Sequence, residues 1–330
     1  MLLDGKAPAS IAQAAEALAA GQLVAFPTET VYGLGADAAS DEAVAQIFAA
    51  KGRPSNHPLI VHIAHAGLAG HFAASVPPFA QALMQAFWPG PLTVIVPRRA
   101  GVANAAAGGQ PTVGLRCPSH PMAQALLQAC AQQTPPVLGL AAPSANRFGR
   151  LSPTSAAHVQ TDLGHALMVL DGGLCEVGIE STIVDCTRCA PVLLRPGTLT
   201  VAQIEAACGL ALTDNLQATA PRASGTLAAH YAPQARLRLM DAKALQTGLD
   251  LLGPDAAHIA IYARVVLRTN SERIIRRRMP DDALACAQQL FAVLHEFDAQ
   301  GARLIWVETP PDCPAWHGVL DRLQRAASAQ

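Results

Sequence analysis

The stretch FPTETVYGLG, residues 26–35, joins an apolar run to a polar segment that contains two glycines. The run that leads into it, 23–26, is short and apolar, which is typical of a buried strand. Pro27 has no N–H to donate to a sheet, so strand pairing should stop there. Threonines, a glutamate and glycines then follow. An ordinary turn uses such residues, and so does a pocket floor where glycines let a ligand approach the backbone.

Composition limits the classes of protein to which the chain can belong. It has 330 residues, of which 51% are hydrophobic and 14% charged. That length suits one large domain or two ordinary ones, and a net charge of -1 gives no general attraction to nucleic acid. The start, MLLDGKAPAS, lacks the pattern of a signal peptide, and no apolar stretch reaches the roughly 18 residues that span a bilayer. We expect no membrane association.

The eight cysteines are scattered along the chain. Only Cys186 and Cys189 form a C-x-x-C pair, and no second pair completes a zinc site. We therefore predict no protein-bound metal and expect a cytoplasmic location, where thiols stay reduced.

Helix and strand patterns follow one another through the first 210 residues. Helices are expected at 10–20, 41–53, 79–88, 121–133 and 200–209. Strands are expected at 58–64, 91–99, 112–118, 137–146, 166–173, 180–187 and 190–197. Residues 211–229 lose this periodicity and are rich in Ala, Thr and Ser, as expected of a linker.

A second set of patterns begins after the linker. Strands are expected at 235–240, 258–264, 272–280 and 302–309, and helices at 241–252, 281–300 and 316–328. This order predicts a small open α/β layer. We divide the chain into a domain at 1–210, a linker at 211–233 and a domain at 234–330. The basic run 276–278 is interpreted as a solvated edge strand, because charge prevents edge-to-edge pairing; a nucleic-acid contact is the alternative.

Familiar nucleotide-binding motifs are absent from the sequence. The three lysines are followed by Ala7, Gly52 and Ala244, so there is no Gly-Lys-Ser/Thr phosphate loop. No G-x-G-x-x-G opens a helix after a strand, and no G-x-S-x-G elbow is present. Ser144 could be a nucleophile only with a base beside it.

Positive side chains nevertheless recur where strands and helices end. They are Lys51, Arg53, Arg116, Arg147, Arg150 and Arg195. Ligands of α/β sheets bind beyond the carboxyl ends of strands, and several cations there would hold a polyanion such as a triphosphate. Hydroxyl-rich loops at PTET, PSAN and EST favour such an anion site.

Six segments resemble, in order, the motifs of the YrdC/Sua5 family. They are FPTETVYGLG, KGRPSNHPLIVHI, VGLRCP, APSANRFGRLSPT, ESTIVDCT and LLRPG, and they span roughly residues 10–205. HYAP, residues 230–233, and the α/β pattern after it resemble the extra domain of the long Sua5 branch. The resemblance implies an α/β fold with a YrdC-like twisted open mixed sheet and flanking helices, plus a smaller C-terminal Rossmann-like domain.

The resemblance also implies an activity. Enzymes of this family are L-threonylcarbamoyladenylate synthases, which join L-threonine, bicarbonate and ATP into threonylcarbamoyl-AMP and release pyrophosphate. Mg²⁺ would be carried by the nucleotide. The product would pass to the machinery that makes the t6A modification in tRNAs that read codons beginning with A, and a direct contact with tRNA is a further expectation.

Site residues are carried over by the same resemblance. Those expected to bind threonine are Thr30, His62, Arg116 and Ser181. Those expected on the ATP side are Lys51, Arg53, His57, Thr112, Ala142, Ser144, Asn146, Ser152, Arg195 and Tyr231. Lys51 and Arg53 are also expected to be catalytic, because they would stabilise charge on the α-phosphate and on the departing pyrophosphate.

Several interpretations stay open. Glu29 is a candidate for the base that deprotonates the amine, but a turn-stabilising carboxylate fits equally. His57 stands where many relatives carry Asn, and the linker lacks their Lys/Arg-rich approach to HYAP. Whether the linker acts as a lid over the site therefore stays open. Rival functions are a module that binds double-stranded RNA or tRNA and a carbamoyl-transfer enzyme.

Overall fold

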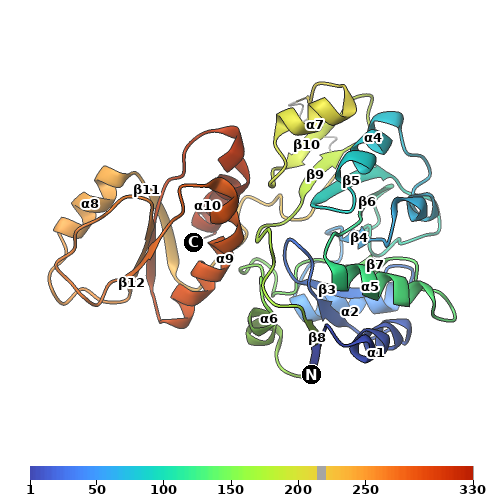
Figure 1. Ribbon diagram of the computed structural model, residues 1–330, viewed down its shortest axis with the longest axis horizontal. Coiled ribbons are helices and arrows are strands. Elements are labelled where there is room, and N and C mark those ends of the chain that lie inside the picture. The colour runs from blue at the N-terminus through green and yellow to red at the C-terminus, as the bar shows by residue number, and fades with distance from the viewer. Residues whose placement is uncertain (214–220, 330) are drawn as a thin grey trace. The chain divides into compact units, whose positions relative to one another are not determined.

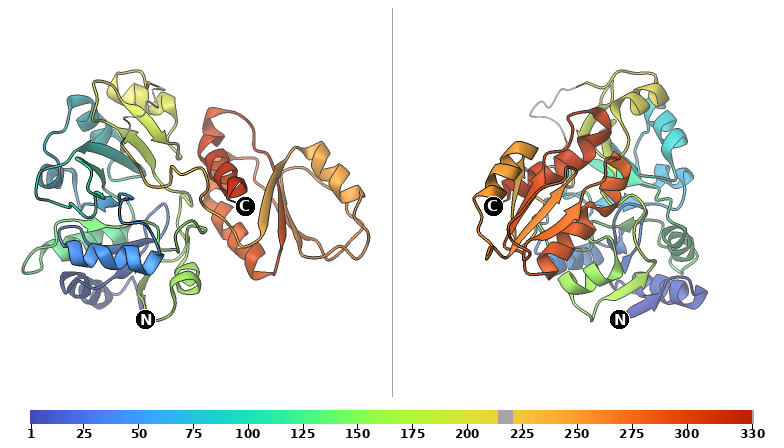
Figure 2. Two further views of the ribbon diagram at one scale, coloured as in Figure 1. Left: turned by 180° about the vertical axis from the view of Figure 1, so that it is seen from behind. Right: turned by 60° about the vertical axis from the view of Figure 1, so that its left-hand side comes forward.

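The computed structural model describes residues 1–213 and 221–329 of the chain. Within these ranges the chain forms two compact units, drawn in Figures 1 and 2. The first contains Met1–Phe148 and the described residues of 152–226, and the second contains Gly149–Leu151 and the described residues of 227–329. The expected linker, 211–233, includes residues 214–220, which lie outside the described residues. In the described ranges no helix is both long and apolar enough to cross a bilayer.

The described part of the first unit is built on a mixed sheet of ten strands. In spatial order they are β1 (Leu2–Asp4), β8 (Met168–Asp171), β2 (Val24–Phe26), β3 (Gly33–Asp37), β7 (Leu140–Ala141), β4 (Ile60–His62), β6 (Thr112–Arg116), β5 (Leu92–Pro97), β9 (Thr182–Asp185) and β10 (Val192–Arg195). Parallel pairs, such as β4 with β6, occur beside antiparallel pairs, such as β5 with β6. Strands that are distant in the sequence therefore bring their ends together.

Helices cover both faces of this sheet. They are α1 (Pro8–Ala19), α2 (Asp41–Lys51), α3 (Ala69–Phe72), α4 (Pro78–Phe87), α5 (Pro121–Ala131), α6 (Ala156–Leu163) and α7 (Val201–Cys208), with a 3-10 turn η1 (Ala66–Leu68). Side chains of β2 alternate between two cores, as expected of a strand that is buried on both sides. Val24 and Phe26 pack with α1 and α5, whereas Ala25 joins the core that contains residues of α2 and α4.

Gly33 and Gly35 lie in β3 rather than in a turn. Neither has a positive φ. A Cβ added at Gly35 would lie 2.8 Å from Cε1 of the Phe26 ring on the paired strand. Gly35 is therefore needed for space beside an aromatic ring. Of the two interpretations left open for these glycines, the turn is wrong for Gly35, which lies within β3.

The second unit has a parallel sheet of four strands in its described residues. Their spatial order is β11 (Arg236–Met240), β14 (Leu304–Glu308), β12 (Ile259–Ala263) and β13 (Ile275–Arg278). The helices are α8 (Ala242–Asp250), α9 (Ala283–Ala299) and α10 (His317–Ser328), with a 3-10 turn η2 (Pro314–Trp316). Figure 1 shows α8 on one face of the sheet and α9 with α10 on the other. Leu245 and Leu249 of α8 pack with Ile261 and Trp306.

The predicted α/β architecture, with a large mixed sheet and a second, smaller α/β unit, is confirmed. Arg276, Arg277 and Arg278 lie in β13, at the edge of the second sheet, and all three are exposed. The edge-strand interpretation of this basic run is therefore also confirmed.

Candidate functional site

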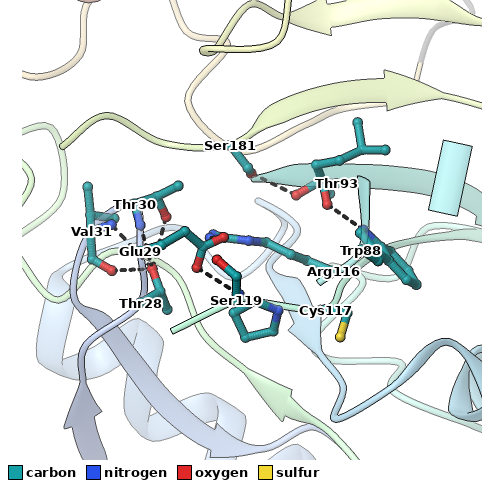
Figure 3. Close-up of polar contacts among 12 residues, drawn as sticks. Thr28, Glu29, Thr30, Val31, Trp88, Thr93, Arg116, Cys117, Ser119 and Ser181 are labelled. Atoms are coloured by element: carbon teal, nitrogen blue, oxygen red, sulfur yellow. Dashed lines mark hydrogen bonds and ion pairs between the residues drawn. The ribbon is translucent and has the colours of Figure 1, made fainter. Parts of the chain in front are cut away.

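The loop after β2 is buried and is held together by its own hydroxyl groups (Figure 3). Thr28 Oγ1 donates to the carbonyl of Val31 at 2.7 Å and accepts from the N–H of Thr30 at 3.2 Å. The hydroxyl oxygens of Thr28 and Thr30 lie 2.9 Å apart. Bonds of this kind satisfy the backbone where Pro27 ends the sheet ladder. The loop therefore presents Glu29 and Thr30 in fixed positions.

Glu29 and Arg116 point toward one another in Figure 3. Glu29 Oε1 lies 2.7 Å from Arg116 Nη2, and the two side chains are only 3% and 4% exposed. Glu29 Oε2 accepts from the N–H of Ser119 at 3.1 Å.

The Glu29–Arg116 pair is close but poorly directed. Among the described residues, Glu29 Oε1, Arg116 Nη2 and Arg116 Nε have no hydrogen-bond partner, so the N–H bonds of Nη2 are not aimed at Oε1. Nε and Nη2 form one edge of the guanidinium, which is the edge that binds a carboxylate through two parallel bonds. Buried donors are rarely left unpaired in a complete site. The edge is thus available to a further acceptor.

His62 lies opposite Arg116 in the register of the parallel strands β4 and β6. Its ring meets the Phe26 ring edge-on, with 6.2 Å between centroids. His62 Nδ1 is buried and has no hydrogen-bond partner in the part of the chain that the structure describes. Burial, and then the charge of Arg116, lowers the pKa of His62 to about 3. The imidazole is therefore neutral near pH 7.

Ser181, immediately before β9, is tied to β5 and β10. Ser181 Oγ lies 2.8 Å from Thr93 Oγ1 and accepts from Arg195 Nη2 at 3.2 Å. The carbonyl of Ser181 accepts from Arg195 Nε at 3.1 Å and from Nη2 at 2.9 Å. Thr93 was not among the predicted site residues; a single threonine within the apolar run LTVIVP was the available signal.

Lys51 is placed by the end of α2. This helix begins after Ser40, whose hydroxyl caps it by accepting from the N–H of Ala43 at 3.1 Å. It ends at Gly52, which has a φ of 62° and so takes the left-handed conformation that glycine favours. Lys51 is thereby delivered to the site in the last helical turn, and Arg53 follows directly after it.

The amino group of Lys51 meets the backbone of the PSAN segment. Lys51 Nζ donates to the carbonyl of Ser144 at 2.5 Å and to the carbonyl of Asn146. Burial, and then the charge of Arg53, lowers the pKa of Lys51 well below its usual value. Asn146 Nδ2 donates to the carbonyl of Arg147 at 2.7 Å. Lys51 thus stabilises the path of this loop.

Arg53 and Arg195 are bridged by a segment of residues 222–226. Arg53 Nη2 donates to Ser224 Oγ at 3.1 Å and to the carbonyl of Pro58 at 2.9 Å. Arg195 Nη1 donates to the carbonyl of Ser224 at 2.9 Å. Ser224 Oγ in turn donates to the carbonyl of Pro58 at 2.8 Å. The family resemblance made the linker a candidate lid, but the contacts of Ser224 with these two guanidinium groups were not predicted.

A recess lies beneath this segment. It is lined by Pro58, Leu59, Ile60, Thr93, Ile95, Gln110, Thr112, Gly114, Ile183, Arg222, Ala223 and Ser224. Arg222 is anchored at its rim, because its N–H donates to Gln110 Oε1 at 2.9 Å. His57 meets the Phe148 ring edge-on at 5.5 Å between centroids, and burial, with the charges of Arg53 and Arg222, lowers the pKa of His57.

The remaining predicted residues occupy other positions. Ala142 follows β7 and donates its N–H to the carbonyl of Ile60 at 3.0 Å. Ser152 is buried and donates its hydroxyl to Glu180. Tyr231 belongs to the second unit, where its ring lies 5.6 Å from that of Phe291 and beneath the guanidinium of Arg322, at 5.4 Å.

Within the first unit, the predicted residues form two groups whose members contact one another. One set contains Arg116 beside His62 and Glu29, and the other contains Arg53 and Arg195, which meet at Ser224. Arg195 also bonds to Ser181, and so connects the second set to the hydroxyl cluster with Thr93. In the described residues, no group of three or more His, Cys, Asp or Glu side chains forms a candidate metal site.

Comparison with known proteins gives matches along nearly the whole chain. Residues 16–197 match a family model described as "Telomere recombination", for Sua5, YciO and YrdC proteins, and residues 199–328 match the C-terminal domain of threonylcarbamoyl-AMP synthase. The threonylcarbamoyl-AMP synthase of Bacillus subtilis is 37% identical over 97% of this chain and 93% of its own length. That of Schizosaccharomyces pombe is 34% identical over 92% of this chain and 85% of its own.

A solved structure is similar to this chain over nearly its whole length. The crystal structure of P. abyssi Sua5 complexed with L-threonine is 34% identical, with a TM-score of 0.87, over 98% of this chain and 95% of that one. The chain belongs to the Sua5 family of threonylcarbamoyl-AMP synthases.

Proposed function

We propose that this chain condenses L-threonine, bicarbonate and ATP into threonylcarbamoyl-AMP, with release of pyrophosphate. Membership of the family supports the reaction as a whole. The observation that carries the assignment to this site is the open edge of the Arg116 guanidinium, whose Nε and Nη2 are buried without hydrogen-bond partners among the described residues.

The threonine carboxylate is proposed to bind that edge. A planar guanidinium binds both oxygens of a carboxylate through two charge-assisted bonds. His62, neutral and buried beside Arg116, has Nδ1 available for a further hydrogen bond. The hydroxyls of Thr30 and Ser181 are proposed to bind the amino or hydroxyl group of the substrate, since each can both donate and accept. The bound threonine in P. abyssi Sua5 supports this choice of amino acid.

The nucleotide is proposed to bind on the side of Arg53 and Arg195. Two buried guanidinium groups that meet at one residue form a receptor for phosphate oxygens. Arg53 would stabilise charge that develops on the α-phosphate and on the leaving pyrophosphate. The remaining members of the proposed ATP set are Lys51, His57, Thr112, Ala142, Ser144, Asn146, Ser152 and Tyr231.

Phosphate oxygens would replace Ser224 at these guanidinium groups. The segment 222–226 uses donors of Arg53 and Arg195 that a triphosphate would require, so bound ATP and this arrangement compete. A segment that moves when substrate binds can also exclude water from a hydrolysable product.

Mg²⁺ is proposed to arrive with the nucleotide. The described residues contain no cluster of His, Cys, Asp and Glu that could hold it. When bound, it would neutralise phosphate charge, and phosphate oxygens and water would supply most of its ligands.

We further propose that the product passes to the enzymes that complete t6A in tRNA, and that the chain works in the cytoplasm, where ATP and tRNA are available. A contact with tRNA is part of this proposal. It is supported only by the chemistry of the pathway step, because the product is an activated acyl-adenylate that another enzyme must consume.

Mass detection of threonylcarbamoyl-AMP from the purified full-length chain tests the proposal. Threonine, bicarbonate, ATP and Mg²⁺ should all be required, and serine should give far less product. Replacement of threonine and bicarbonate by carbamoyl phosphate would reveal a carbamoyl-transfer enzyme instead. RNA binding without pyrophosphate release would support the RNA-binding alternative.

A further inference from the structure

We propose that Glu29 is the catalytic base that removes a proton from the threonine ammonium group, an assignment that rests on the function proposed above. The amino group must be unprotonated before it can attack the carbon of bicarbonate. A general base must lie within hydrogen-bond reach of the proton that it takes. Glu29 meets this requirement through the position of Oε1.

Glu29 Oε1 is an acceptor without a donor. It is buried, lies 2.7 Å from Arg116 Nη2, and receives no hydrogen bond from the described residues. The other oxygen, Oε2, is held by the N–H of Ser119, so the carboxylate cannot rotate freely. A single carbon joins the carboxylate and the ammonium of an α-amino acid. A substrate carboxylate on the open edge of Arg116 therefore places the ammonium next to Oε1.

Charge balance favours proton transfer at this position. Glu29, Arg116 and a zwitterionic threonine carry two negative and two positive charges in a buried site. Transfer of one proton from the ammonium to Glu29 leaves one negative charge, on the substrate carboxylate, and one positive charge, on Arg116. The net charge stays zero while two buried charges disappear. Burial disfavours the charged forms of both carboxylates and amines, so it drives this transfer.

Other titratable groups face Glu29 but suit the role less well. Arg116 and Cys117 approach from β6 and the residue after it, His120 from the start of α5, and Cys175 from the loop after β8. Burial raises the pKa of both thiols, so they stay protonated, and lowers the pKa of His120.

Two histidines near the site are also poor bases. His120 Nδ1 already accepts from the N–H of Met122 at 3.2 Å. His62, with a pKa of about 3, binds a proton too weakly to take one from an ammonium group. Glu29 is thus the group whose position suits the role, because Oε1 is buried beside Arg116 and receives no hydrogen bond from the described residues.

The step can be written with all atoms and charges. Glu29 takes one proton, which leaves a neutral amine and a neutral carboxylic acid. The amine forms a C–N bond to bicarbonate, one C–O bond breaks, and water leaves with the second amine proton, which gives the carbamate anion. A carbamate oxygen then bonds to the α-phosphorus of ATP, and the bond to pyrophosphate breaks with its electron pair. Glu29 returns its proton to solvent when the product leaves.

The pH dependence of kcat tests the assignment. Pyrophosphate release is measured at saturating substrates between about pH 6.5 and 9.5, where an amino group loses its proton. Glu29→Gln keeps the shape but not the base, and should lower kcat near pH 7 by about 10²- to 10⁴-fold. The loss should shrink by up to about tenfold for each pH unit, because solvent then deprotonates the amine.

The matched control is Asp185→Asn, which removes another buried carboxylate, bonded to Thr187 at 2.7 Å. Its kcat relative to the unmodified chain should be the same at every pH. The assignment would be overturned if the fold-loss of kcat in Glu29→Gln did not change with pH. It would also be overturned if kcat of Glu29→Gln stayed close to that of the unmodified chain. Failure of the unmodified chain to make threonylcarbamoyl-AMP would instead refute the proposed function.

Chemical rescue provides a second test if Glu29→Gln does not fold. Glu29→Ala leaves space beside Arg116 for a small carboxylate. Added formate should raise kcat of Glu29→Ala in proportion to its concentration, and should not raise kcat of the unmodified chain. No increase in a Glu29→Ala sample that still unfolds cooperatively would contradict a base at this position.

Discussion

His62 and Arg116 lie opposite one another at the carboxyl ends of two parallel strands, β4 and β6. This placement buries a neutral imidazole beside a permanent positive charge, and lowers the pKa of His62 to about 3. The same pairing directs the Arg116 guanidinium toward Glu29 on the loop after β2. The site therefore depends on the register of one strand pair.

The depressed pKa of His62 predicts acid sensitivity. In an unfolded chain a histidine has a pKa of about 6.5, so between that pH and about 3 the unfolded state binds more protons than the folded state. Stability contributed by neutral His62 is thus complete above pH 6.5 and falls as the pH is lowered, by up to about 1.4 kcal/mol per unit. Urea unfolding between about pH 5 and 7.5 measures this slope, which His62→Gln should reduce.

Exposed His165 offers the control for that slope. His165→Gln should leave the pH dependence of the unfolding free energy as it is in the unmodified chain. If His62→Gln showed the same slope as the unmodified chain, His62 would not be held neutral by its surroundings.

Arg116→Ala should weaken threonine binding far more than ATP binding. Loss of a buried bidentate partner costs about 2–5 kcal/mol, or roughly 30- to 5,000-fold in Kd. Arg116→Lys should also bind threonine poorly, because an ammonium cannot match both carboxylate oxygens. Calorimetric titration of each ligand measures the two constants, with exposed Arg99→Ala as the control. Equal weakening of both ligands would contradict the placement of the threonine carboxylate.

Ser224→Ala should tighten ATP binding by about two- to tenfold. The change removes a hydroxyl that bonds to Arg53 and Pro58, and a hydrogen bond of this kind contributes about 0.5–1.5 kcal/mol. Thr226→Ala is the matched control, because Thr226 bonds within the same segment, to the carbonyl of Ala223 at 2.9 Å. Titration with ATP measures the constants. Weaker ATP binding in Ser224→Ala would mean that Ser224 contacts the bound nucleotide instead of competing with it.

Features that depend on residues close together in the sequence were predicted best. The helix expected at 41–53 is present as α2, which ends at Lys51, directly before Gly52 and earlier than expected. Strands were expected around His62 and Arg116, and Arg116 was correctly placed at a strand end. The family and the enzyme class predicted from the motifs are confirmed by the comparisons.

Long-range pairing could not be predicted in the same way. The strand order depends on which edges meet in space, so the contact between Glu29 and Arg116 was not foreseen. The strand expected at 137–146 is present only as the two-residue β7, because its pairing with the neighbouring strands β3 and β4 ends at Ala141. Ser224 lies in a polar segment whose composition indicates only a linker, although it bonds to Arg53.

Gly35→Ala tests how tightly β3 packs against the Phe26 ring on the paired strand β2. A glycine within a strand is ordinarily less stable than alanine there, by roughly 0.5–1 kcal/mol, so the exchange would stabilise an unobstructed strand. At Gly35, however, the new Cβ would lie 2.8 Å from the buried Phe26 ring. Overpacking of this kind costs about 1–3 kcal/mol, so we expect a lower free energy of unfolding by urea. Gly70→Ala, in α3 with no atom within 4 Å of the new Cβ, should be neutral or stabilising. A stabilised Gly35→Ala would show that the Phe26 ring moves aside easily, and that Gly35 is not required for packing against it.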